Sequence, residues 1–276
     1  MSPVLCFLGT AALAAFVALP LAAQSTGLET LSRRDQLLGW EAVGRIDLDG
    51  DGFCTGTLIA PDLVLTAAHC VFNGGGKAID PKDILFSAGY AEGTAIASSV
   101  VSQTVAHPAY LPNTPVSPEN VRHDVALLKL ANPIPAALAA PFSIRAPGKG
   151  DAISVVSYAS GREEVLSWQR QCSVLDRAEG LIAMDCDVTF GASGAPVLDR
   201  SGARARIVSI VSAGGPTDQG HVAYGMDLPS VVEDLKRLMA TGQVLAAAGT
   251  SAAPKGQRLG VGKGQSRDIG ARFVKP

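Results

Sequence analysis

Short apolar runs separated by turn-forming residues dominate the middle of the chain. Residues 56–60 and 63–67 flank the pair Pro61-Asp62, which predicts two strands joined by a hairpin turn. Further runs of the same kind lie at residues 84–88, 96–105, 125–130, 152–158 and 207–213. Many short strands with turn residues between them are typical of an all-β barrel or sandwich.

One amphipathic helix is predicted after these runs, beginning at Pro229. Proline suits the first position of a helix, and Gly242 can end it. Acidic residues at 233 and 234 precede basic residues at 236 and 237, an order that complements the helix dipole. One face carries the apolar residues Val231, Val232, Leu235, Leu238 and Met239. We expect this face to pack on the strands.

Residues 1–23 are predicted to be a signal peptide. The segment from 4 to 19 is apolar and uncharged, and Leu21-Ala22-Ala23 precedes the expected cleavage point. An uncleaved anchor helix is the alternative, which Pro20 and the short apolar run disfavour. Residues 24–41 follow and contain Arg33-Arg34, so they form either a short pro-segment with a dibasic cleavage point or an N-terminal arm.

Residues 242–276 differ in composition from the rest of the chain. They are rich in Ala and Gly, and they hold six basic residues against Asp268 alone. Such a composition predicts a disordered basic tail, and a solvated tail is favoured over one that contacts an anionic surface. Residues 42–241 therefore form the expected folded domain.

Composition restricts the partners of the protein. The 276-residue chain is 47% hydrophobic and 17% charged, with a net charge of −2. That apolar content suffices for a sizeable core in a single all-β domain. Nothing in this small net charge points to nucleic acid or to an anionic surface as a partner. We expect no nucleic-acid partner, no stable membrane insertion after removal of the signal peptide, and a monomer.

The five cysteines predict two disulfides. Cys6 would leave with the signal peptide, which keeps four cysteines in a chain directed to an oxidising compartment. The close pairs suggest Cys54–Cys70 and Cys172–Cys186, with other connectivities left open. A zinc site is the alternative, but no Cys-x-x-Cys or paired His–Cys spacing supports it.

Three motifs carry the residue types that nucleophilic catalysis requires. His69 follows one strand-like run, Asp124 directly precedes another, and Ser193 stands in the sequence Gly-Ala-Ser-Gly. A serine hydroxyl is a weak nucleophile, so an imidazole must take its proton and a carboxylate must orient that imidazole. The N–H groups of Gly191 and Ser193 are the expected oxyanion donors, because glycine permits a tight backbone path. Each motif alone is more often structural, whereas the three together favour catalysis.

These motifs resemble those of the chymotrypsin/trypsin-like serine proteases. Residues 66–70, Thr-Ala-Ala-His-Cys, are similar to the family's histidine motif, residues 123–130 to its aspartate motif and residues 191–196 to its serine motif. The chain order His, Asp, Ser is also that of the family. The resemblance covers roughly residues 42–241 and points to the bacterial secreted branch with its glutamyl-endopeptidase-like members.

The resemblance implies an all-β fold of two six-stranded antiparallel β-barrels with a C-terminal helix. The active site would lie in the cleft between the barrels, with His69 and Asp124 from the first and Ser193 from the second. The implied activity is that of a secreted or periplasmic serine endopeptidase, which hydrolyses polypeptide substrates through an acyl-enzyme without a cofactor or metal. An esterase with the same acyl chemistry is an alternative.

Ala192 departs from the family pattern. In the mammalian digestive members an Asp precedes the nucleophile and pairs with an N-terminal amine that zymogen cleavage frees. We infer that other contacts hold the oxyanion loop here, as in the glutamyl-endopeptidase-like branch. The alternative is a catalytically weak or inactive binding protein that keeps the protease fold.

Three residues are candidates for substrate binding. Asp187 lies six residues before Ser193, where trypsin-like members place the acid that binds Lys or Arg side chains, although similar acids occur in members without that preference. Gly214 belongs to a segment that resembles the substrate-lining strand. Ser212 stands where glutamate-specific members usually carry a His, which argues against that specificity, and it would instead reach toward Asp124.

The remaining notable residues are assigned structural roles. Residues 47–52 begin like a calcium-binding loop, but the twelfth position is Leu58 rather than Glu, so a polar hairpin turn is expected. In an extended chain the side chain of His123 would point away from that of Asp124, so no chemistry is expected of it. The other residues assigned to structure are His221, in a surface loop, and Trp40 and Trp168, in packing.

Overall fold

The structure is a computed structural model that describes residues 27–48, 50, 52–148, 151–217 and 220–242. The predicted signal peptide, residues 243–276 of the predicted tail, and Asp49 and Asp51 of the calcium-like segment lie outside these residues. Within the described part of the chain, no helix is long and apolar enough to cross a membrane.

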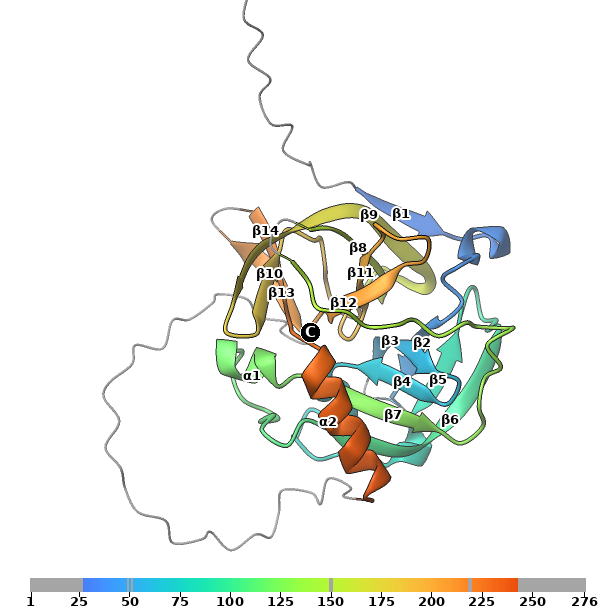
Figure 1. Cartoon of the computed structure of the whole chain (residues 1–276). Helices are drawn as coiled ribbons and strands as arrows, with labels where there is room; N and C mark the ends of the chain where they lie inside the picture. The colour runs from blue at the N-terminus through green and yellow to red at the C-terminus, as the bar shows by residue number, and fades with distance from the viewer. Residues whose placement is uncertain (1–26, 49, 51, 149–150, 218–219, 243–276) are drawn as a thin grey trace, which may run out of the picture.

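The first half of the described chain forms a closed antiparallel barrel (Figure 1). Its strands pair around the barrel in the order β2-β3-β4-β7-β6-β5. Leu65 of β4 pairs with Leu127 of β7, and both side chains are fully buried, because one face of each strand lines the barrel interior. The bounds are β2 Val43–Asp47, β3 Phe53–Ala60, β4 Leu63–Thr66, β5 Leu85–Ala88, β6 Ala97–Ala106 and β7 Ala126–Leu130.

The second half forms an eight-stranded antiparallel sheet that curves into a half-barrel. Its order is β12-β11-β8-β9-β10-β14-β13, and β1 also pairs with β9. The bounds are β1 Leu28–Leu31, β8 Ala152–Ala159, β9 Arg162–Ala178, β10 Leu181–Met184, β11 Pro196–Asp199, β12 Arg206–Ile210, β13 Ala213–Thr217 and β14 Gly220–Met226. The predicted all-β architecture of two barrels is thus confirmed.

The second barrel differs from a closed six-stranded one at the junction of β12 and β14. There the Ser209 hydroxyl donates to the carbonyl of Met226 at 2.9 Å and accepts from the Met226 N–H at 3.0 Å. A Cβ added to Gly225 would lie 2.3 Å from Ser209 Oγ, so the two strands approach closely at this point. A side chain therefore bridges the strands where a backbone ladder would otherwise close the barrel.

The predicted C-terminal helix is α2, Pro229–Ala240. Val232 and Leu235 are its buried residues, and the helix packs on β6 and β7 of the first barrel (Figure 1). Because α2 follows β14 of the second barrel, it ties the two barrels together. The short helices η1 Arg34–Leu37, η2 Ala68–Val71, η3 Pro81–Asp83 and α1 Pro118–Arg122 were not predicted, since so few residues show no helical periodicity.

The described part of the N-terminal segment 24–41 is built into the fold. β1 pairs with β9 from Leu28 opposite Gln169 to Leu31 opposite Leu166. Leu31 is buried, and the ring centroids of Trp40 and Trp168 lie 5.1 Å apart. Both tryptophans therefore have the packing role expected of them.

Candidate active site

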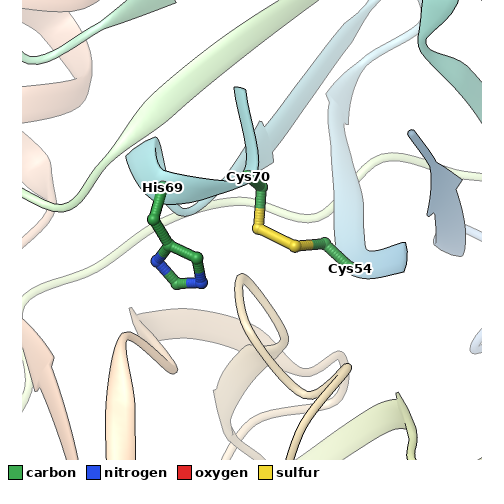
Figure 2. Close-up of side chains that lie close together, drawn as sticks. All are labelled: Cys54, His69 and Cys70. Atoms are coloured by element: carbon green, nitrogen blue, oxygen red, sulfur yellow. A yellow bond between two sulfur atoms is a disulfide. The ribbon is translucent and has the colours of Figure 1, made fainter. Parts of the chain in front are cut away.

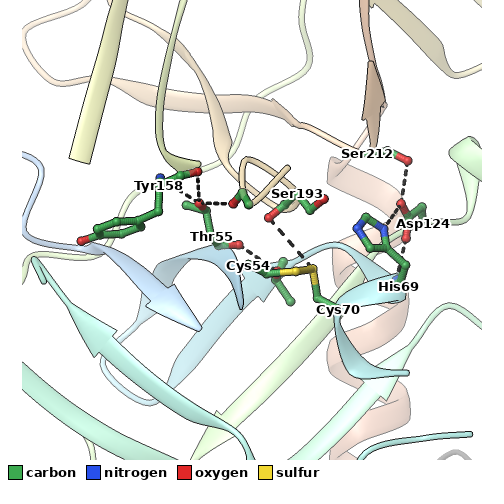
Figure 3. Close-up of a disulfide and its surroundings, with 10 residues drawn as sticks. Cys54, Thr55, His69, Cys70, Asp124, Tyr158, Ser193 and Ser212 are labelled. Carbon is green, nitrogen blue, oxygen red and sulfur yellow. Dashed lines mark hydrogen bonds and ion pairs between the residues drawn. A yellow bond between two sulfur atoms is a disulfide. The ribbon is translucent and has the colours of Figure 1, made fainter. Parts of the chain in front are cut away.

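The barrel topology places His69 and Asp124 next to each other. β4 pairs with β7, so η2 at the end of β4 and residue 124 at the start of β7 meet at one end of the barrel. His69 Nδ1 lies 2.7 Å from Asp124 Oδ2, and the His69 backbone N–H donates to Asp124 Oδ1 at 2.8 Å (Figure 3). The Asp124 side chain is buried, so this bond is shielded from water. In the neutral imidazole, a proton on Nδ1 leaves Nε2 as the acceptor.

The segment that carries His69 is fixed by a disulfide. Cys54 of β3 and Cys70 of η2 are bonded, and Figure 2 shows the His69 ring beside this bridge. The second disulfide joins Cys172 and Cys186, so both bonds are the pairs suggested by the sequence. Among the described residues, the two groups of clustered ligand atoms each contain one of these disulfides, whose sulfurs are not thiolates.

The loop of Ser193 presses against the same end of the first barrel. The Ser193 carbonyl accepts a hydrogen bond from the Thr55 N–H at 2.9 Å, and it lies 4.0 Å from Cys70 Sγ. A Cβ added to Gly194 would lie 2.2 Å from Thr66 Oγ1, and the φ angle there is +76°. Glycine is therefore required at 194 for Ser193 to approach the His69 segment (Figure 3).

Ser212 joins the site from the second barrel. Its hydroxyl donates to Asp124 Oδ2 at 2.6 Å (Figure 3). The same carboxylate oxygen lies 2.7 Å from His69 Nδ1. The expected contact between Ser212 and Asp124 is thus present, and it links the two barrels at a buried carboxylate.

Ala192 faces the interior of the second barrel. Its side chain is fully buried in an apolar cluster with Val188, Ala195 and Val211. A carboxylate at this position would lie among apolar side chains and would need a buried cationic partner. The alanine is therefore consistent with its surroundings.

A pocket of about 310 Å³ opens beside His69 and Asp124. Its walls come from both barrels and include the rings of Phe72 and Tyr110, whose centroids lie 5.7 Å apart, and Ala213. Burial raises the pKa of Tyr110, so its hydroxyl stays neutral. The sequence did not indicate this pocket, because its walls come from segments far apart in the chain.

The other candidate binding residues lie on neighbouring segments of the second barrel. The Asp187 side chain is exposed, and its Oδ1 lies 3.8 Å from Nδ1 of His221. A Cβ added to Gly214 of β13 would lie 2.5 Å from Cγ2 of Val188, which belongs to the loop after β10, so only glycine fits at this position. The prediction of a surface loop for His221 is wrong, because this residue belongs to β14.

His123 also differs from its prediction. It follows α1 with φ −100° and ψ 0°, so the chain is not extended there. Its ring stacks on that of His107, with centroids 4.4 Å apart. Burial and the neighbouring His123 lower the pKa of His107. His123 directly precedes Asp124 in the chain.

Comparison with known proteins bears on this site. A family model described as a trypsin-like peptidase domain matches residues 54–204, a range that includes His69, Asp124 and Ser193. Human Serine protease 56 is 29% identical over 126 residues, which are 44% of this chain and 19% of that protein. The match thus spans about a fifth of that relative.

Solved structures share the arrangement of the two barrels. A Glu endopeptidase in complex with MPD has a TM-score of 0.63 at 22% identity, covering 80% of this chain and 100% of its own. Protease Anisep from Arthrobacter nicotinovorans has a TM-score of 0.59 at 18% identity, covering 73% of this chain and 96% of its own. The thermostable serine protease AL20 from an extremophilic microorganism has a TM-score of 0.58 at 19% identity, covering 73% of this chain and 97% of its own. At these identities the likeness establishes the fold.

Proposed function

Since the chain belongs to the trypsin-like peptidase family, we propose that it is a serine endopeptidase with His69, Asp124 and Ser193 as its catalytic triad. The observation that carries the proposal is the 2.7 Å contact between His69 Nδ1 and the buried carboxylate of Asp124. The position of the Ser193 loop against the His69 segment supports it further.

The proposed mechanism proceeds through an acyl-enzyme. Ser193 Oγ attacks the peptide carbonyl carbon while Nε2 of His69 takes its proton. The imidazolium then protonates the leaving amine, and the acyl group remains esterified to Ser193. A water molecule attacks the ester with His69 again as the base, and the proton returns to Ser193. Asp124 holds His69 in the required tautomer and stabilises the imidazolium.

The oxyanion that forms in both steps is assigned to the N–H groups of Gly191 and Ser193. Such donors act strongly because they are already oriented when the negative charge develops. The positive φ of Gly191, +85°, is compatible with the tight turn that brings two N–H groups to one point.

Polypeptides are the proposed substrates. Within the described residues β13 pairs with β14 on one side only, so its other edge can accept an extended peptide as an added strand. Asp187, Ser212 and Gly214 would border the position of the residue before the scissile bond. The pocket lined by Phe72 and Tyr110 would take a large apolar substrate side chain next to His69.

An extracytoplasmic location is proposed on chemical grounds. The protein has two disulfides, and such bonds form and persist in oxidising environments outside the cytoplasm and are rare inside it. This agrees with the signal peptide expected at residues 1–23. Sequencing the N-terminus of the exported protein by mass spectrometry would test both statements together.

Covalent labelling tests the catalytic assignment. A fluorophosphonate probe should label the folded wild-type protein at Ser193, and Ser193→Ala should abolish labelling. His69→Ala should slow labelling strongly, because the hydroxyl loses its base. Folded wild-type protein that takes up no probe would contradict the proposal and favour a binding protein on a protease scaffold.

A further inference from the structure

The orientation of two peptide groups decides whether Gly191 and Ser193 can donate to an oxyanion. A loop with glycine at 191 can rotate its peptide groups easily. No acid at position 192 is present to anchor the loop, since that residue is a buried alanine. Some other contact must therefore hold the loop in the donating conformation, if the proposed function holds.

The carbonyl groups of the loop show how its N–H groups are aimed. The Phe190 carbonyl accepts from the Ser160 N–H at 2.7 Å. In a planar trans peptide the C=O and N–H bonds point in opposite directions, so the Gly191 N–H points away from Ser160. The Ala192 carbonyl accepts from the Ala195 N–H at 2.9 Å, which orients the Ser193 N–H in the same manner.

Thr55 of β3 binds the same loop from the first barrel. Its hydroxyl donates to the Gly191 carbonyl at 2.8 Å and accepts from the Tyr158 N–H at 3.0 Å. Its backbone N–H donates to the Ser193 carbonyl at 2.9 Å. Thr55 is fully buried, so water does not compete for these bonds (Figure 3).

The other side of Gly191 is closed by an aromatic ring. A Cβ added to Gly191 would lie 2.2 Å from the Phe53 ring, and Arg45 lies over that ring with its guanidinium 4.9 Å from the centroid. The loop is thus confined between Phe53 and the turn that joins β8 to β9. Thr55 holds the carbonyl groups of Gly191 and Ser193.

We propose that Thr55 is a positioning residue, whose hydroxyl keeps the Gly191–Ser193 loop in the conformation that aims both N–H groups at the oxyanion. The inference rests on the proposed function and extends it. It accounts for Ala192, because a hydrogen bond from the first barrel takes the place of an ion pair to a newly freed N-terminal amine. The peptidase therefore needs no such amine for its oxyanion loop to form.

The test compares three variants of β3. Thr55→Val removes the hydroxyl with little change of shape, Thr55→Ser keeps it, and Thr57→Val is the matched control. Thr57 is equally buried on the same strand, and its hydroxyl has no hydrogen-bond partner among the described residues. Steady-state kinetics on a peptide ester or amide, thermal unfolding and inhibition by a peptide aldehyde are measured for each.

Thr55→Val should lower kcat by about 10- to 100-fold while KM changes by less than about threefold, because the loss concerns the transition state. Affinity for the aldehyde, which forms a tetrahedral oxyanion, should fall in parallel with kcat. Affinity for the corresponding peptide acid, a product analogue that forms no tetrahedral oxyanion and is measured as a second inhibitor, should stay unchanged. Thr55→Ser should restore most of kcat, and Thr57→Val should match the wild type.

Two results would overturn the inference. One is a Thr55→Val enzyme with wild-type kcat and aldehyde affinity. The other is a Thr55→Ser enzyme as impaired as Thr55→Val, with both losses following the melting temperature, which indicates a merely structural role. Wild-type protein that no fluorophosphonate labels contradicts the proposed function itself, so the two failures are distinguishable.

Discussion

The hydroxyl of Ser212 lies 2.6 Å from Oδ2 of Asp124, and these two residues belong to different barrels. Asp124 thereby receives hydrogen bonds from the His69 segment on one side and from the second barrel on the other. A carboxylate held from both sides cannot rotate away from the imidazole. The relative position of the two barrels is therefore coupled to the orientation of His69.

Removal of this hydroxyl should weaken catalysis without abolishing it. We expect Ser212→Ala to lower kcat/KM by about 10-fold, because a hydrogen bond to a charged group contributes about 1.5–3 kcal/mol and Asp124 keeps two others. Peptide hydrolysis measures the change. Ser154→Ala is the control, since that buried hydroxyl has no hydrogen-bond partner in the described structure. If Ser212→Ala and the wild type have the same kcat/KM, the role proposed for Ser212 is contradicted.

The pocket beside His69 should select large apolar side chains. Burying one such side chain contributes about 1.5–3 kcal/mol. Val116→Trp would fill part of the pocket, and we expect KM for a peptide with Phe or Leu there to rise about 10-fold relative to a peptide with Gly. A profile over a peptide library in both proteins measures this ratio. An unchanged ratio would show that substrates do not enter this pocket.

The N-terminal arm should remain part of the mature protein. Leu31 is buried in the core, whereas Leu28 on the same strand is exposed. Leu31→Ala should lower the free energy of unfolding by about 2–4 kcal/mol, and Leu28→Ala should change it much less. Urea unfolding measures both. Equal effects, or a purified active form whose mass shows cleavage at Arg33-Arg34 and loss of the arm, would support a removable pro-segment instead.

Asp199 should make stability depend on pH. Hydrogen bonds from Arg145, from the Ser201 N–H and from Arg206 hold the pKa of its buried carboxyl well below the usual range. A lowered folded-state pKa stabilises the fold above the unfolded-state pKa of about 3.9, and this contribution is lost as the pH falls through the folded-state value.

Asp199→Asn should therefore cost about 1.5–3 kcal/mol at pH 7, because the partly exposed guanidinium groups of Arg145 and Arg206 lose a charged hydrogen-bond acceptor. The difference from the wild type should shrink below about pH 4. Urea unfolding at several pH values measures it. Glu233→Gln, on the exposed side of α2, is the control and should change stability little at any pH. A pH-independent cost at Asp199 would contradict this account.

Local signals in the sequence determined much of the fold. The apolar runs at 56–60 and 63–67 appear as β3 and β4, and the run from Pro229 appears as α2, because alternation and amphipathicity are properties of neighbouring residues. β9 was missed, since its 17 residues mix charged and apolar side chains without a clear alternation. β1 was missed because it is ordered only by its pairing with β9.

In the candidate site, too, local sequence motifs identified some of the residues, whereas the contacts between them required the tertiary structure. His69, Asp124 and Ser193 each stand in a short motif, so the sequence alone was enough to single them out, together with Ala192 as the residue that departs from the family. The contacts that orient them are long-range. Thr55 meets Gly191 across 136 positions, and Ser212 meets Asp124 across 88. Only the packing of one barrel against the other decided these contacts, because no local pattern records which distant residue will fill a buried hydrogen bond.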